Sequence, residues 1–249
     1  MKKLLNSNAL KVIAIIAMTI DHLTWILFPG YQTNIIIIIL HLIGRLTCPI
    51  MCYFIAEGFH HTKDINKYTL RLFIFAVISH FAYIFGTHNF DGIMSFVPFA
   101  SGKILDQTSV MWSLAWGLVM LRIDYSSKIK NNFVKVLLIL LICIITIPSD
   151  WSCIASLIIL AFGTNKSYFK KQMFWLVSYT VVYALVYFFA LDKVYGLIQL
   201  GAILTIPLLA LYNGERGSNV LINKIMKWFF YIYYPLHLVI LGILQILIK

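Results

Sequence analysis

The chain has 249 residues, of which 61% are hydrophobic and only 12% are charged, and its mean hydropathy is +0.88. About a quarter of the residues of a soluble domain are charged, so this composition excludes an ordinary soluble fold. It also excludes disorder, which requires low hydrophobicity together with high net charge. The net charge of +11 does not indicate a nucleic-acid partner, because no basic stripe lies on a soluble element.

Apolar segments follow one another along the chain, and most are long enough to cross the ~30 Å hydrocarbon core of a bilayer as helices. We predict an all-α, polytopic transmembrane helical bundle with about nine spans, at residues 9–28, 35–58, 70–87, 108–123, 133–148, 151–164, 173–190, 195–212 and 228–248. The first span is expected to be retained, because it contains Asp21 and His22 and no small-residue cleavage site follows it. Residues 1–249 are predicted to form a single domain that contacts membrane lipid.

The distribution of Lys and Arg among the predicted loops indicates the direction of the chain. With a cytoplasmic N-terminus, sixteen of the twenty cationic side chains fall in cytoplasmic loops, three fall outside, and Arg45 lies within the membrane. The positive-inside rule therefore predicts an N-terminus inside and a C-terminus outside the cell. This alternation, loop by loop, agrees with the predicted number of spans.

Ionisable residues inside the predicted spans are informative, because burying a charge in a bilayer costs at least ~2.5–3.5 kcal/mol. Asp21 and His22 lie in the outer half of the first span, either as a base with a nearby carboxylate or as interfacial residues that reach water. Arg45 lies near the middle of the second span, where it needs an anion or a salt bridge, with Asp21 as one candidate. Pro49 cannot donate to the carbonyl of Arg45, which opens the backbone there. Glu57 lies at the cytoplasmic end, where a solvated helix end is the alternative.

Three later regions carry further candidates. His80 lies in the outer half of the third span, where an interhelical hydrogen bond is the alternative to a functional role. Asp150 lies in the turn between the fifth and sixth spans, where it could instead cap a helix. Tyr234 and His237 lie in the last span, and His237 is too deep to belong to an interfacial aromatic belt.

Four of these residues fall at similar depth on four different spans, namely His22, Arg45, His80 and His237. We expect them to converge on one polar site. Such a set suits proton removal from a nucleophile beside an anion or a developing oxyanion. It does not suit zinc, because the chain has no His-x-x-x-His pair and no thiolate cluster with ligand spacing, so no metal is predicted.

Several short motifs in chain order resemble those of the TraX family, which includes the F-pilin acetylase of conjugative plasmids. They are Asp21-His22, Gly44-Arg45, Glu57-Gly58-Phe59, Asn213-Gly214-Glu215-Arg216-Gly217 and Tyr234-Pro235-Leu236-His237-Leu238. The resemblance implies an integral acetyltransferase of the bacterial inner membrane. Such an enzyme would move acetyl from cytoplasmic acetyl-CoA to an amine or hydroxyl of a membrane-associated, pilin-like, peptide or glycan acceptor.

Within an enzyme of this kind we expect His22 to act as general base and Asp21 to orient it. Arg45 would hold a buried anion or carboxylate, and His237 would position or polarise the thioester carbonyl. Acetyl-CoA is the donor substrate, and its phosphates call for cations at the cytoplasmic face. The candidate substrate- and cofactor-binding residues are Lys63, Lys67, Arg71 and Arg216, together with Glu57, His80, Asp150 and Tyr234.

Two other functions remain open on the sequence. A proton-coupled or anion transporter would also use Arg and His inside the membrane, although the chain shows no internal repeat of the transporter kind. A non-catalytic assembly factor of a pilus or envelope complex is the second alternative.

Overall fold

The computed structural model describes residues 4–87, 97 and 105–248. These residues form helices and turns, and within them extended pairing is limited to two isolated bridges, Leu5 with Tyr212 and Thr108 with Ser149. Six stretches of the described chain are long and apolar enough to cross a membrane. The protein is therefore an all-helical, multi-pass membrane protein. Four predicted loop cations, Lys2, Lys3, Lys103 and Lys249, lie outside the described residues.

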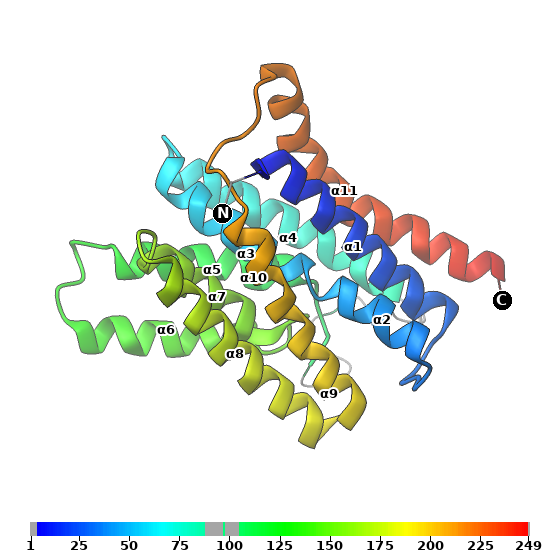
Figure 1. The fold of residues 1–249 in the computed structure, drawn as a ribbon. Helices are drawn as coiled ribbons and strands as arrows, with labels where there is room; N and C mark the ends of the chain where they lie inside the picture. The colour runs from blue at the N-terminus through cyan, green and yellow to red at the C-terminus, as the bar shows by residue number, and fades with distance from the viewer. Residues whose placement is uncertain (1–3, 88–96, 98–104, 249) are drawn as a thin grey trace. The chain divides into compact units, whose positions relative to one another are not determined.

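The helices follow the predicted spans closely (Figure 1). They are α1 (Ser7–Leu27), α2 (Ile35–Gly44), α3 (Thr47–His61), α4 (Ile65–Thr87), α5 (Val110–Asp124), α6 (Asn132–Thr146), α7 (Ser152–Thr164), α8 (Phe169–Ala190), α9 (Lys193–Gln199), the 3-10 helix η2 (Leu200–Leu204), α10 (Thr205–Ala210) and α11 (Val220–Ile248). The six candidate spans are α1, the run from α2 to α3, α4, α8, the run from α9 to α10, and α11. Each of the nine predicted spans contains a helix, but α5, α6 and α7 have only 13 to 15 residues and are not among the six, so the number of nine spans stays a prediction.

Short polar side chains begin many of these helices. Asn6, Asn34 and Asn131 each accept a hydrogen bond from a backbone amide in the first turn of α1, α2 or α6. Asp192 accepts one from the amide of Tyr195 in α9. Such caps satisfy amides that have no partner within the helix, so the polar residues between apolar segments decide where the helices start.

The predicted second span is divided in two in the structure. α2 ends at Gly44, Arg45 and Leu46 form a turn, and α3 begins at Thr47. Pro49 then lies in the first turn of α3, where a residue without an amide proton is tolerated. The helix is interrupted at the carbonyl to which Pro49 cannot donate a hydrogen bond, as the sequence indicated. Arg45 therefore lies in an irregular segment between two helices.

The chain divides into two compact units, which we call the terminal unit (Met1–Met51 with Leu176–Lys249) and the central unit (Cys52–Trp175). In the terminal unit α1 lies between α2 and α11, and α9 and η2 pack against α2 (Figure 1). In the central unit α5 packs against α4, α6 and α7. The single domain of the sequence analysis stays a prediction.

A glycine sets the close approach of α1 and α2 in the terminal unit. A Cβ atom at Gly44 would overlap the side chain of Asp21. Small residues at helix interfaces allow backbones to come together in membranes. Gly44 therefore leaves room for the carboxylate beside the break in the second span.

Candidate active site

Asp21 is the centre of a buried charged network in the terminal unit. Its carboxylate, on α1, accepts a hydrogen bond of 2.7 Å from Nδ1 of His41 on α2 and forms an ion pair with the guanidinium of Arg45. Arg45 also donates from Nη1 to Oε1 of Gln199 on α9, at 3.2 Å. The network thus ties α1, α2 and α9 together, and the structure shows the salt bridge to Asp21 that the sequence left open as one alternative for Arg45.

Burial makes this pairing obligatory. The side chains of Asp21 and Arg45 are 9% and 11% exposed. Leaving one buried charge without its partner is strongly destabilising, because neither water nor another ion can replace it. Arg45 is accordingly used to hold Asp21 and Gln199, and it fixes the irregular segment between α2 and α3.

His22 and His237 form a second network on another side of α1. Nδ1 of His22 lies 2.7 Å from Nε2 of His237 on α11, and the two rings are stacked with centroids 5.0 Å apart. His237 is buried, whereas His22 is partly exposed. Two histidines of the predicted set, His22 and His237, are therefore in direct contact.

The positions of the protons in this pair follow from its backbone partner. Nδ1 of His237 lies 3.0 Å from the carbonyl oxygen of Tyr233, which can only accept a hydrogen bond, so Nδ1 carries the proton. Nε2 of a neutral His237 is then an acceptor, and Nδ1 of His22 must donate to it. A neutral His22 consequently keeps its lone pair on Nε2, which is the arrangement required of a proton acceptor.

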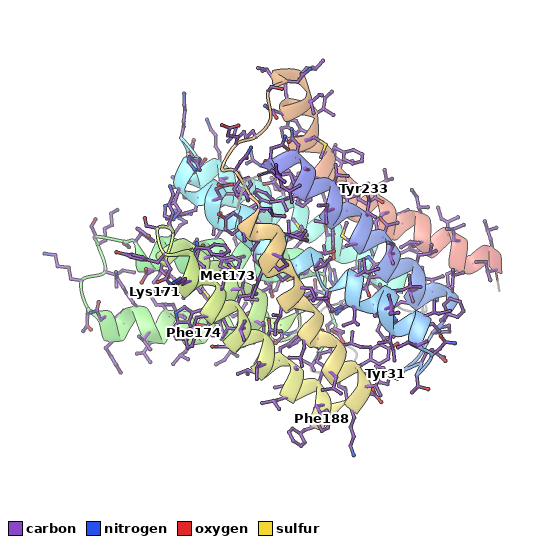
Figure 2. All side chains as sticks on the ribbon, viewed as in Figure 1. Tyr31, Lys171, Met173, Phe174, Phe188 and Tyr233 are labelled. Carbon is purple, nitrogen blue, oxygen red and sulfur yellow. The ribbon has the colours of Figure 1, made fainter. Side chains whose placement is uncertain are left out.

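Aromatic residues hold His237 in this orientation. The ring of Tyr233 stacks on that of His237 with centroids 5.2 Å apart, and the ring of Tyr234 meets it edge-on at 5.5 Å. Thr19 uses its proton on the carbonyl of Ile15, so the hydroxyl of Tyr233 donates to Oγ1 of Thr19, at 2.6 Å. Tyr233 therefore links α11 to α1 one turn away from the histidine pair (Figure 2).

The predicted role of Asp21 toward His22 needs correction. The hydrogen-bond partners of the carboxylate are His41 and Arg45, and the partner of His22 is His237. The cause is helical geometry: adjacent residues point about 100° apart, so Asp21 faces α2 while His22 faces α11. His237, rather than Asp21, orients His22.

His80 and Asp150 belong to the central unit. Nδ1 of buried His80, on α4, lies 3.0 Å from Oγ1 of Thr108. The amide of Asp150 donates to the carbonyl of Thr108, at 2.8 Å. Asp150 does not cap α7, because the N-cap position is held by Trp151, whose φ is +63°. Both candidates thus meet at Thr108, within the central unit.

The remaining candidates lie near helix ends. In the central unit Lys63 and Lys67 are exposed, Glu57 on α3 is partly exposed, and Arg71 on α4 lies over the ring of Tyr68 at 5.3 Å. Lys67 also pairs with Asp64, whose pKa is lowered by the hydrogen bond from the amide of Lys67. In the terminal unit Arg216 is exposed, between α10 and α11.

Three residues of the two networks were missed by the sequence analysis: His41, Gln199 and Tyr233. His41 carried a usable signal, because it lies four residues before Arg45 in an apolar run and so on the same helical face. Gln199 and Tyr233 carried none, since an uncharged polar side chain in a helix has many ordinary roles. Within the described residues, no group of three or more His, Cys, Asp or Glu side chains is placed to hold a metal ion.

The fold and the two networks define a multi-pass helical membrane protein whose ionisable residues pair between helices. The family model described as TraX protein matches residues 6–245, so the chain belongs to the TraX family. It is also 29% identical over 245 residues to the "Probable fimbrial assembly protein FimC, serogroup H1" of Dichelobacter nodosus, which covers 93% of this chain and 92% of the relative. No solved structure matches the chain.

Proposed function

We propose that the protein is a membrane acetyltransferase that uses acetyl-CoA as donor. The observation that carries this proposal is the hydrogen bond between His22 and His237, which leaves Nε2 of His22 as a partly exposed proton acceptor inside a helical membrane protein. A general base of this kind contributes ~10²–10⁴-fold to a transfer reaction. The resemblance of the chain to the F-pilin acetylase supports the choice of acetyl as the group transferred.

The proposed step consumes one acceptor molecule and one thioester. The acceptor hydroxyl or amine loses a proton to Nε2 of His22 and attacks the acetyl carbonyl. The C–S bond then breaks, and the proton passes to the sulfur to give free CoA. His237 contributes by fixing the tautomer of His22, a role that the bond to the carbonyl of Tyr233 supports.

The donor is proposed to enter from the cytoplasm. The proposed topology has the N-terminus inside, the C-terminus outside and about nine spans in one domain. The distribution of positive charge among the loops favours this orientation. CoA phosphates would bind cations at the inner ends of helices, and Arg71 is the best candidate because it is partly buried in the second turn of α4. Lys63, Lys67, Arg216 and Glu57 are the further candidates for this face, with His80, Asp150 and Tyr234 for the remainder of the substrate site.

The product tests the proposal directly. Pilins, surface polymers and secreted peptides are compared by mass spectrometry between cells with and without the gene. We expect at least one species to lose the mass of an acetyl group in the deletion strain and to regain it on complementation. Identical acetylation in both strains would refute the proposal.

A non-catalytic role in pilus assembly is the second candidate, and the name of the Dichelobacter nodosus relative favours it. An assembly factor needs its surfaces but not the basicity of one imidazole. Pilus formation that persists in a His22→Asn variant without acetylation would separate the two roles, whereas normal acetylation in that variant would exclude His22 as base.

A further inference from the structure

His41 has a buried nitrogen that neither network uses. The residue is 1% exposed, its Nδ1 is bound to Asp21, and its Nε2 is buried with no hydrogen-bond partner among the described residues. Buried polar atoms are nearly always paired, and leaving one unpaired costs about 1–3 kcal/mol. A bound molecule that reaches Nε2 with a polar atom would supply this hydrogen bond.

The protonation of His41 defines what that partner is. The carboxylate of Asp21 accepts from Nδ1, so a neutral imidazole carries its lone pair on Nε2 and takes a hydrogen-bond donor. The negative charge of Asp21 is already paired with Arg45. An incoming ammonium would meet the positive charge of Arg45 without a spare carboxylate, so an uncharged hydroxyl suits the position better.

Two aromatic rings pack against the imidazole of His41. The rings of Trp25 and Tyr195 have centroids 4.8 Å and 5.2 Å from that of His41. Tyr31, labelled in Figure 2, packs on Tyr195 with ring centroids 4.8 Å apart and is 47% exposed. Ring contacts therefore lead from the loop after α1 to the buried imidazole. Apolar faces beside a few hydrogen-bonding atoms are typical of small-molecule sites, and they suit a ring that carries hydroxyl groups.

We propose that Nε2 of His41 binds the acyl acceptor, and that this acceptor is a polyhydroxylated ring such as a sugar. The inference rests on the proposed acetyltransferase function. One hydroxyl of the acceptor donates to His41 and is not consumed, while another hydroxyl of the same acceptor becomes the acetyl ester in the step proposed above. Trp25, Tyr31 and Tyr195 contact the apolar face of the ring, and Tyr31 lies at the exposed end of the cluster.

The test uses membranes of the strain that carries the gene, incubated with radiolabelled acetyl-CoA. Label bound to the acceptor is measured before and after mild alkali, which cleaves esters and leaves amides. The decisive variant is His41→Asn, because the amide nitrogen of Asn still donates to Asp21 from the position of Nδ1 but nothing replaces Nε2. His61→Asn, which changes an exposed histidine outside both networks, is the control.

We expect alkali-labile label in wild-type membranes, about a tenfold or greater loss in His41→Asn at unchanged protein level, and no loss in His61→Asn. Full incorporation by His41→Asn would show that His41 only anchors Asp21, which overturns this inference and leaves the proposed function intact. Alkali-stable label would overturn the hydroxyl acceptor alone. Wild-type membranes that incorporate no more label than those of the deletion strain would refute the proposed function itself.

A second variant covers a failure of His41→Asn to fold. Trp25→Leu leaves the bond between His41 and Asp21 in place and removes one aromatic face of the site. It is expected to lower incorporation at limiting acceptor and to have less effect when acceptor is in excess. Unchanged incorporation at limiting acceptor would contradict the proposed ring contact.

Discussion

Nδ1 of His22 and Nε2 of His237 lie 2.7 Å apart, across the interface between α1 and α11. The carbonyl of Tyr233 decides the direction of this hydrogen bond, because it forces the proton of His237 onto Nδ1. A backbone carbonyl on α11 thereby sets the basic nitrogen of a side chain on α1.

Replacing His22 tests the basic nitrogen itself. His22→Asn keeps a donor toward His237 but has no atom at the position of Nε2, and His22→Ala removes both. We expect both variants to lose ~10²–10⁴-fold in the rate of CoA release at saturating acetyl-CoA, with near-normal binding of the donor. A His22→Asn variant that keeps more than about a tenth of the wild-type rate would contradict the assignment.

Variants of His237 test orientation. In His237→Gln the amide oxygen can accept the hydrogen bond from His22, whereas in His237→Leu nothing accepts it. We expect the Gln variant to retain several times the activity of the Leu variant, with both below wild type, as kcat measured in detergent. Equal rates for the Gln and Leu variants would show that a hydrogen-bond acceptor at residue 237 is not needed. If His237→Leu lost all activity while His22→Asn kept normal activity, His237 would be the base and His22 the orienting residue.

Arg45→Lys tests the bond geometry of the charged network. The guanidinium reaches Asp21 and Gln199 at once through two nitrogens, which a single ammonium on a different stem cannot reproduce. We expect at least about a tenfold loss of activity while the protein remains inserted. Wild-type turnover by the inserted lysine variant would mean that any cation suffices there.

Gly44→Ala tests the approach of α1 and α2. The added methyl group would overlap Asp21, so the two helices must separate or the carboxylate must move. Overpacking of this kind costs typically ~1–3 kcal/mol, and we expect a lower thermal midpoint in detergent together with reduced activity. Gly30→Ala serves as the comparison, because no atom lies within 4 Å of its added Cβ and only its φ of +82° is strained. An unaltered midpoint in Gly44→Ala would argue against the close packing.

Charge reversal at Arg71 tests the donor site. Arg71→Glu replaces a cation in the second turn of α4 by an anion, which should repel the phosphates of CoA. The expected result is a higher KM for acetyl-CoA with little change in kcat and in protein level. Lys63→Glu, at an exposed position before α4, should have a smaller effect. An unchanged KM in Arg71→Glu would remove this residue from the donor site.

Hydropathy and composition predicted the helical class and the sites of most helices, because a bilayer requires long apolar segments whose backbone groups are bonded internally. Pro49 located the break in the second span, since the lost amide proton is a local effect. The two compact units were not predicted. They depend on which helices pack together, and helix packing in membranes is weakly encoded in a single sequence.

The cost of burying charge singled out Asp21, His22, Arg45 and His237, and all four lie in the two networks of the terminal unit. Their pairing was only partly predictable, because depth along a helix says nothing about the direction of a side chain around it. That is why Asp21 was expected at His22 and is found at His41. His80 shares their predicted depth and bonds Thr108 in the central unit, a partner that depth along a helix could not predict.

The proposal that His22 is the general base of acetyl transfer is tested most directly by the release of free CoA. The rate is measured with purified protein and acetyl-CoA, and envelope material of the native strain is the acceptor. The account predicts steady release by the wild-type protein and a ~10²–10⁴-fold lower rate for His22→Asn at equal protein concentration and stability. Equal rates for the two proteins, or no release by the wild-type protein above an empty-detergent control, would contradict it.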